Sequence, residues 1–274
     1  MINMTEEYMK EFAKTMKVGL VATIDEENDP HITILSTIMA KSDKEMMFGE
    51  FVCGLSKQNV LKNGKSGFLI MNLSKEFWTG TMKWTHKLTE GEDFIMYNMQ
   101  PKYRYNTYFG IHTVHYADLI DLSEKRKLDM TAIITNALKV MIKKGRYAGN
   151  NSKEIMKPWA TALMKKMDTL KFISYIDLEG YPRIIPIIQA QAVSSNRIVL
   201  SDNPYKLELD KIHENSRVAI FGLNLDMENV LLKGVFSGFK KGIATFDIDR
   251  VYNSMPPKQG YIYPPVKKEA VKEF

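Results

Sequence analysis

A segment of this chain occurs twice, and this internal repeat constrains the fold more than any other feature of the sequence. The stretch VGLVATIDEENDPHITILSTIMA, which begins at Val18, aligns with LKFISYIDLEGYPRIIPIIQAQA, which begins at Leu170. The offset stays at 152 residues throughout, so that Pro30 matches Pro182. A chain that carries one unit twice is expected to fold as two similar domains.

Each copy predicts the same series of short elements. Two β-rich runs are separated by an acidic or glycine-containing turn, at residues 25–30 and 177–182, which is typical of a β-hairpin. A third strand follows, then a short helix at about 55–64 and 204–215, and then a further strand. Many short strands with one small helix favour a closed or partly closed barrel, because closure removes exposed strand edges. The sequence therefore predicts a β-rich α+β protein made of two barrels.

The segment between the two copies has the pattern of a helix. Residues 123–144 carry apolar side chains at the 3.6-residue spacing of an amphipathic helix. We therefore expect a first barrel unit over residues 1–124, a helical linker over 125–152, and a second barrel unit over 153–274 that ends in an extended tail.

Composition narrows the class of protein. The chain has 38 basic and 32 acidic side chains, and its lysines are scattered along the whole length, which favours a solvated surface over a concentrated site for nucleic acid or membrane. It contains no run of roughly 18 uncharged apolar residues, and the single cysteine, Cys53, cannot form an internal disulfide. We expect a cytoplasmic protein with neither a membrane nor a nucleic acid as partner.

Three motifs carry a resemblance to a known family: DLEGYPRIIPI in the second copy, and PHITILST and MMFGEFVCGLSKQNVLKNGKSGFLIM in the first. They resemble the FMN-binding split barrel of the pyridoxamine 5′-phosphate oxidase superfamily, over about 55 residues in each copy. In that superfamily two barrels pack as a homodimer with FMN at the interface. The resemblance therefore implies a pseudo-dimer within one chain, open to further homodimerisation, with two potential flavin sites related by approximate two-fold symmetry.

The resemblance places the phosphate of FMN at the start of the short helix in the first copy. Ser56 and Lys57 occupy the phosphate-binding positions, where a cation and the helix dipole attract a dianion. Asn59 lies one turn further on, and Thr33 and Ser36 are hydrogen-bond candidates on the facing strand.

The second copy departs from this pattern. At an offset of 151 residues the Ser-Lys pair falls on Leu207 and Glu208. A carboxylate at that place repels a phosphate, so we expect this site to be degenerate. The Tyr205-Lys206 pair two residues earlier leaves a substitute phosphate site open.

His31 and Arg183 hold equivalent positions at the start of the second strand of each copy. Either is a candidate to approach a flavin edge or a phosphate, and the alternative is that both are exposed residues at a strand start. A cation beside the flavin ring would stabilise the reduced anionic flavin.

An aromatic-rich segment over residues 91–110 is the candidate substrate region. Tyr103, Arg104 and Tyr105, with Trp84 on the preceding strand, are candidates to cover a planar ring by stacking and to hold an anionic substrate. The alternative is an aromatic-packed helix and loop that fills an interface.

The pair His112 and His115 has a spacing found in metal sites. In a strand, however, residues three apart point to opposite faces, and no acidic or cysteine partner at suitable spacing accompanies the pair. We expect no metal site.

The sequence thus predicts a flavoprotein with FMN as cofactor, an oxidoreductase in which reduced nicotinamide, NAD(P)H, passes electrons through FMN to a small or planar acceptor. One alternative is a non-catalytic protein that binds or stores flavin or haem. Pyridoxamine 5′-phosphate oxidase activity itself is less favoured, because its Arg-rich C-terminal substrate motif is absent from the sequence. A basic barrel that binds single-stranded nucleic acid is a third alternative.

Overall fold

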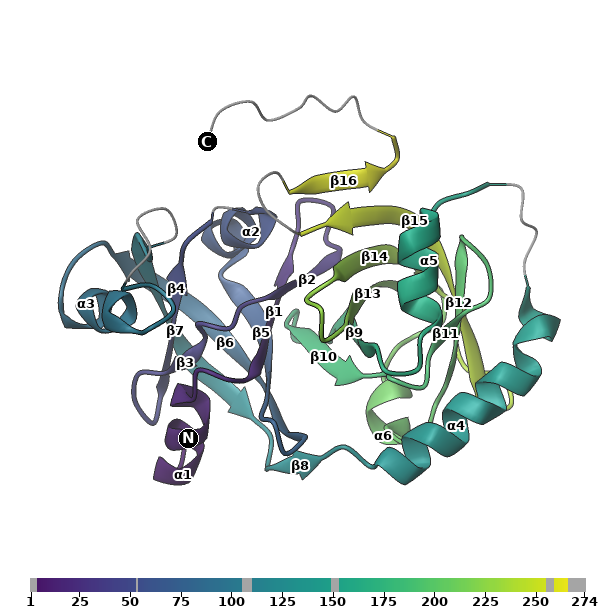
Figure 1. Ribbon diagram of the computed structural model, residues 1–274, viewed down its shortest axis with the longest axis horizontal. Helices are drawn as coiled ribbons and strands as arrows, with labels where there is room; N and C mark the ends of the chain where they lie inside the picture. Colours follow the sequence, from purple (N-terminus) through teal and green to yellow (C-terminus); the bar gives the residue numbers. More distant parts are fainter. Residues whose placement is uncertain (1–3, 53, 105–109, 149–152, 255–258, 266–274) are drawn as a thin grey trace. The chain divides into compact units, whose positions relative to one another are not determined.

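The computed structural model of the protein describes residues 4–52, 54–104, 110–148, 153–254 and 259–265. Strands of the first repeat and the residues that follow it are β1 (Val18–Ile24), β2 (Pro30–Ile34), β3 (Met39–Ala40), β4 (Glu45–Glu50), β5 (Lys65–Met71), β6 (Glu76–Leu88), β7 (Thr113–Leu122) and β8 (Arg126–Lys127). The helices in this part are α1 (Glu6–Ala13), α2 (Leu55–Asn63) and α3 (Glu92–Met99) (Figure 1).

The second part of the chain contains the same kinds of element. Its strands are β9 (Leu170–Ile176), β10 (Pro182–Pro186), β11 (Gln191–Ala192), β12 (Arg197–Ser201), β13 (Arg217–Leu223), β14 (Asn229–Phe236), β15 (Ile243–Asn253) and β16 (Gly260–Tyr263). Its helices are α4 (Met130–Lys143), the 3-10 helix η1 (Lys144–Tyr147), α5 (Pro158–Lys165) and α6 (Lys206–Leu209).

The two sheets have one topology, which confirms the duplication. Hydrogen-bonded neighbours run β2-β1-β5-β6-β7-β4-β3 in the first sheet and β10-β9-β13-β14-β15-β12-β11 in the second, and each sheet has eight strands. In both hairpins a residue in the left-handed region closes the turn, Asn28 at φ 60° and Gly180 at φ 77°, which is a conformation that favours glycine and asparagine.

Individual hydrogen bonds repeat at the offset of 152 residues as well. The Leu35 N–H donates to the Gly19 carbonyl at 2.7 Å, and the Ile187 N–H donates to the Lys171 carbonyl at 2.7 Å. A second contact is repeated with a different side chain in each copy. Thr37 Oγ1 donates to the Gly49 carbonyl, and Gln189 Nε2 donates to the Ser201 carbonyl. The repeated backbone geometry thus tolerates different side chains.

The first sheet curls around one core. Val21 on β1, Phe48 on β4 and Trp78 on β6 belong to one cluster of buried residues. Strands β1 and β4 lie near opposite ends of the strand order, so a shared core requires that the sheet curve back toward itself. The expected architecture of two β-rich split barrels is confirmed.

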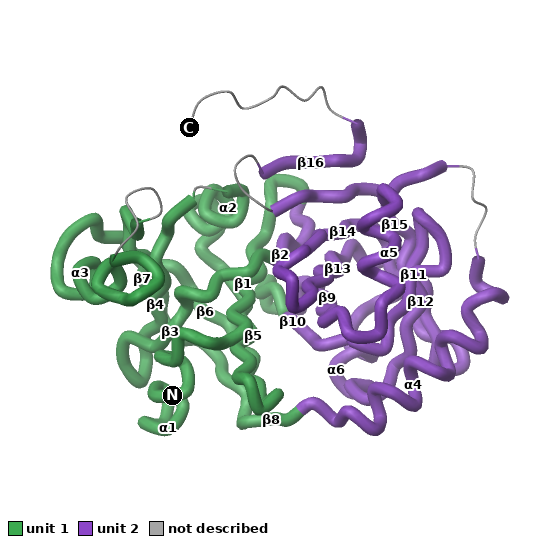
Figure 2. The backbone as a smooth tube through the Cα atoms, in the orientation of Figure 1, with its two compact units in different colours: residues 1–27, 33–127, 178–183 green, residues 28–32, 128–177, 184–274 purple. Residues whose placement is uncertain are grey.

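Two compact units make up the chain (Figure 2). Unit 1 comprises residues 1–27, 33–127 and 178–183, and unit 2 comprises residues 28–32, 128–177 and 184–274. Each unit therefore includes the hairpin turn of the other repeat.

Those two turns are held by different chemistry within their units. In unit 1, Lys65 Nζ donates to the Glu179 carbonyl at 2.6 Å and lies 4.9 Å from the centre of the Tyr181 ring. In unit 2, Arg217 makes three hydrogen bonds to the buried carboxylate of Asp29, at 2.7–3.1 Å. Lys65 and Arg217 are equivalent at the offset of 152.

Helix α4 begins at Met130, seven residues later than the expected start. Arg126 and Lys127 pair with β6 as strand β8, and the carboxylate of Asp129 accepts a hydrogen bond from the Ala132 N–H at 2.9 Å, which caps the helix. The helix packs within unit 2 through Val140. Among the described residues, none of the helices has both the length and the apolar character that a membrane crossing needs.

Candidate functional site

Helix α2 presents an N-terminus suited to an anion. It begins after Gly54, which is extended, and ends at Gly64, whose φ of 76° stops the helix. No side chain of the described residues caps the first turn, and that turn carries no acidic residue. The Lys57 N–H donates to the Gly54 carbonyl at 3.2 Å, so the N–H groups before it are the ones that a helix start offers to an oxyanion.

The predicted phosphate residues lie on this helix. Ser56 is buried, and Lys57 is half-buried with its Nζ donating to the Val52 carbonyl at 2.6 Å. Asn59 is buried and donates to Thr23 Oγ1 on β1 at 3.1 Å. The Asn59 side chain therefore fixes the helix to the sheet, while Ser56 and Lys57 lie in the first turn.

A second predicted region meets the loop after β2. Lys102 Nζ lies 3.0 Å from Ser36 Oγ, and Tyr97 Oη donates to the Thr37 carbonyl at 2.8 Å. Thr33 is half-buried on β2, three residues before Ser36. The structure thus brings Ser36 together with the turn at residues 100–104, two regions that the sequence could only place separately.

That turn also contacts the segment that leads into α2. The rings of Tyr103 and Phe51 lie 6.3 Å apart between centres, and Phe51 follows β4 directly. Tyr103 is buried, and this burial raises the pKa of its hydroxyl to about 12, so it stays protonated at neutral pH. Arg104 is exposed, and Tyr105 lies outside the described residues.

We define the candidate site as the residues of unit 1 that these contacts connect. They come from the loop after β2, the segment from β4 into α2, and the turn after α3: Ser36, Phe51, Ser56, Lys57, Lys102 and Tyr103. Lys102 is exposed, and partial desolvation lowers the pKa of its ammonium.

A buried hydrogen-bonded chain lies in the same unit and was not expected. Trp84 Nε1 donates to His115 Nδ1 at 3.2 Å, and His115 Nε2 lies 2.7 Å from Glu50 Oε2. Because an indole N–H only donates, His115 Nδ1 accepts and Nε2 carries the proton toward the carboxylate. Trp84 therefore orients a histidine, and the ring-covering role expected for it stays a prediction.

The side chain of Glu50 is a negatively charged carboxylate at neutral pH. Burial alone would raise the pKa of Glu50, but the hydrogen bond from His115 and the positive charge of Lys57 outweigh it and hold the pKa below its ordinary value. Glu50 and His115 are 65 residues apart and meet only through the β4–β7 pairing, so no local sequence signal identifies them. Among the described residues, no group of three side chains is suited to hold a metal ion.

The equivalent pair His31 and Arg183 occupies two different environments. His31 is buried in unit 2 with its ring edge-on to Tyr252, at 4.7 Å between centres. Arg183 is half-buried in unit 1 and forms an ion pair with Asp121. His31 is therefore not an exposed residue at a strand start, and the cationic group of Arg183 already has an acidic neighbour.

Unit 2 has a much shorter helix at the place of α2. Helix α6 is a single turn that begins at Lys206, and the Lys206 ammonium pairs with Asp202 at 3.3 Å and Asp210 at 2.8 Å. The two helices start 151 residues apart, but the strands after them, β5 and β13, correspond at 152. The Ser-Lys pair thus matches Leu207-Glu208 at one offset and Glu208-Leu209 at the other, and neither supplies a hydroxyl and a cation.

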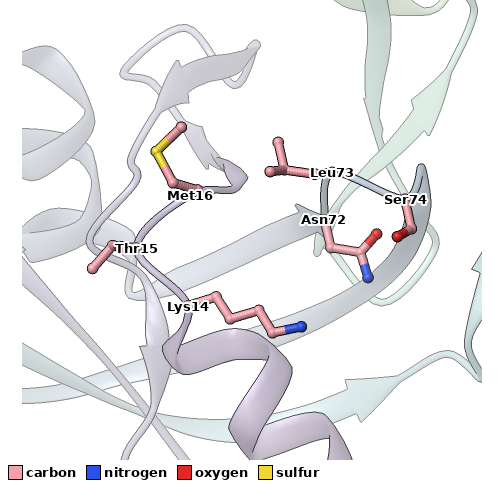
Figure 3. A pocket seen from close by; sticks show the side chains of 6 residues that line it. All are labelled: Lys14, Thr15, Met16, Asn72, Leu73 and Ser74. Atoms are coloured by element: carbon pink, nitrogen blue, oxygen red, sulfur yellow. The ribbon is translucent and has the colours of Figure 1, made fainter.

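A surface pocket of about 330 Å³ lies elsewhere in unit 1 (Figure 3). Its lining residues come from the segment after α1 and from the turn between β5 and β6: Lys14, Thr15, Met16, Asn72, Leu73 and Ser74. The Lys14 ammonium forms an ion pair with Glu11 at 2.7 Å. None of the predicted site residues that the structure describes lines this pocket.

The chain is similar to several solved structures. No protein-family model and no curated protein sequence matches it. An FMN-binding protein from Syntrophomonas wolfei is 16% identical, with a TM-score of 0.37, over 45% of this chain and 86% of that one. A putative pyridoxamine 5′-phosphate oxidase from Lactobacillus delbrueckii is 13% identical, with a TM-score of 0.36, over 45% and 96%. An F420 reductase is 10% identical, with a TM-score of 0.37, over 43% and 98%.

Proposed function

We propose that unit 1 binds FMN at the candidate site and that the protein is an FMN-dependent oxidoreductase. The observation that carries the proposal is the first turn of α2, which has no side-chain cap and no acid, and which carries Ser56 and Lys57. A hydroxyl, an ammonium and helix N–H groups together are a donor set for a phosphate dianion.

The remaining residues of the candidate site fit a planar, polar ring. Phe51 and Tyr103 supply aromatic surface, and the buried Tyr103 hydroxyl makes no hydrogen bond with any described residue. Ser36 and Lys102 add a hydroxyl and a cation beside them. An isoalloxazine ring has both an apolar body and hydrogen-bonding edges, so this mixture of groups suits it.

Bound FMN would supply the hydride and electron chemistry, and the side chains would bind and orient it. Lys57 holds the phosphate, and the burial of Ser56 and Tyr103 keeps water away from the groups that bind the cofactor. The proposed donor is NAD(P)H, and the proposed acceptor is a small or planar molecule. The positive charge of Lys102 favours an acceptor that carries a negative charge.

Only one FMN per chain is proposed. Helix α6 is too short to offer a helix N-terminus of the kind found in α2, and its Lys206 is engaged by two carboxylates. Glu208 corresponds to Lys57 at the offset of 151 residues and to Ser56 at the offset of 152, so a carboxylate lies at a phosphate-binding position in both alignments.

A pair of charge variants tests the proposal. Two unit charges about 4 Å apart interact by about 4 kcal/mol at an effective dielectric constant of 20, so Lys57→Glu should weaken FMN binding by at least ~100-fold. Glu208→Ala is the matched control in unit 2 and should leave the affinity unchanged. Flavin fluorescence titration gives both dissociation constants and the stoichiometry, which we expect to be one.

Anaerobic addition of NADH or NADPH to the FMN-loaded protein then tests the reaction. Bleaching of the flavin absorbance supports the oxidoreductase. A bound flavin that neither nucleotide reduces would instead support a non-catalytic flavin-binding protein. Absence of FMN binding by the wild-type chain, or equal loss in the two variants, would contradict the proposed site.

A further inference from the structure

The hydroxyl of Tyr103 differs from those of the two tyrosines that lie in the same buried cluster of unit 1. The side chain is 4% exposed and belongs to a buried cluster with Tyr97 and Tyr116. The hydroxyls of these two neighbours are satisfied, since Tyr97 Oη donates to the Thr37 carbonyl and Tyr116 Oη donates to Asp93 Oδ2, both at 2.8 Å. The Tyr103 hydroxyl has no hydrogen-bond partner among the described residues.

A buried hydroxyl without a partner is unfavourable, because it has lost its hydrogen bonds to water and gained none in return. A phenylalanine at the same position would fill nearly the same volume without this penalty. The chain therefore carries a polar group here that none of the described residues uses.

The position of Tyr103 indicates which ligand could accept a hydrogen bond from its hydroxyl. Its ring lies against Phe51, which leads into the first turn of α2, and the adjacent Lys102 contacts Ser36. Tyr103 thus lies among the residues to which the proposed function assigns the cofactor, and its own backbone is fixed by a hydrogen bond from its N–H to the Gln100 carbonyl at 2.9 Å.

We propose that the Tyr103 hydroxyl is a binding group that donates a hydrogen bond to an oxygen acceptor of the bound flavin. This inference rests on the proposed function. It concerns the hydroxyl of Tyr103, whereas stacking on a flavin would need only the aromatic ring. With a pKa of about 12, the hydroxyl carries its proton at neutral pH and acts as a donor. The acceptor is either a phosphate oxygen or a ring carbonyl, both of which accept hydrogen bonds.

Two conservative variants separate a ligand-directed hydroxyl from a structural one. In Tyr103→Phe the protein without FMN should melt at the same or a higher temperature than the wild type, because an unpaired polar atom has been removed. The same variant should bind FMN about tenfold more weakly. The matched control Tyr97→Phe, in the same cluster, should melt at a lower temperature, because it leaves the Thr37 carbonyl without its donor.

The measurements are the melting temperature without FMN and the dissociation constants for FMN and for riboflavin. Weaker binding of both ligands by Tyr103→Phe places the acceptor on the ring, and weaker binding of FMN alone places it on the phosphate. Unchanged FMN affinity in Tyr103→Phe, while the wild type binds FMN, overturns this inference and leaves the proposed function intact. A lower melting temperature of Tyr103→Phe without FMN also overturns it, and a wild type that binds no FMN overturns both.

Discussion

Removal of the negative charge of Asp29 should destabilise unit 2 strongly. The Asp29 side chain is 3% exposed and faces two arginines, Arg217 at 2.7–3.1 Å and Arg250. Substitution of one partner in a buried ion pair costs about 3–5 kcal/mol, because the opposite charge stays buried without compensation. Arg217 also contacts Asp249 and is 32% exposed, so part of its charge stays balanced. We therefore expect Asp29→Asn to lower the free energy of unfolding by about 3 kcal/mol, at the low end of that range.

A matched control is available in unit 1. Asp121 pairs with Arg183, but the two side chains are 42% and 28% exposed, and exposed pairs contribute only about 0–1 kcal/mol. Asp121→Asn should therefore change the stability of unit 1 by less than about 1 kcal/mol. The comparison isolates the effect of burial, because both substitutions remove one carboxylate charge that faces an arginine.

Hydrogen exchange read by mass spectrometry reports the two units separately, which matters because a two-unit chain need not unfold in one step. In Asp29→Asn, faster exchange should appear at residues 28–32 and along β13 and β15, which carry Arg217 and Arg250. Equal effects of the two substitutions would refute the argument, since it would mean that burial does not set the contribution of the charge. Unchanged exchange at residues 28–32 would show that the ion pairs do not hold this turn.

Two further predictions concern the dependence of stability on pH. Burial lowers the pKa of Lys171 from 10.5 to about 8, so between these values the unfolded chain binds a proton that the folded chain has lost. The free energy of unfolding should rise across that pH window, by on the order of 3 kcal/mol at most. Urea unfolding of Lys171→Met at several pH values should show a shallower rise. If the variant's free energy of unfolding rises with pH as steeply as that of the wild type, Lys171 does not cause the rise. The pKa of Glu50 is lowered, so its contribution is present above its ordinary pKa and is lost as the pH falls through the lowered value. Glu50→Gln should lower the free energy of unfolding by about 1–3 kcal/mol at pH 7. The variant should also lose less stability than the wild type when the pH is lowered. An equally steep loss of stability on acidification would contradict this prediction.

Local patterns in the sequence were sufficient for most of the fold. The short helix of the first copy is expected at about 55–64 and is observed at Leu55–Asn63, because Gly64 directly after it supplies the left-handed residue that ends a helix. The start of α4 was misplaced because β8 at Arg126–Lys127 forms only by pairing with β6, which is distant in sequence. The same reason applies to the Glu50–His115 contact, which depends on the register between two strands, and to Asn59, whose partner Thr23 lies on β1. Motif resemblance indicated residue types for a phosphate site, but it could not tell which side chains the fold itself already uses.

The contacts repeated at an offset of 152 residues explain how the two units can share a fold while their chemistry differs. Pairs such as Leu35 to Gly19 and Ile187 to Lys171 are backbone hydrogen bonds, which do not depend on side-chain identity. Side chains at equivalent positions are therefore free to change, and they do so where Lys65 meets the Tyr181 ring but Arg217 meets Asp29. A unit that keeps its backbone pairing can lose the Ser-Lys pair of one helix without losing its sheet. The proposed asymmetry, with one FMN bound in unit 1 and none in unit 2, thus requires no difference in sheet topology; it follows from the lost Ser-Lys pair and from the shortening of the helix from α2 to α6.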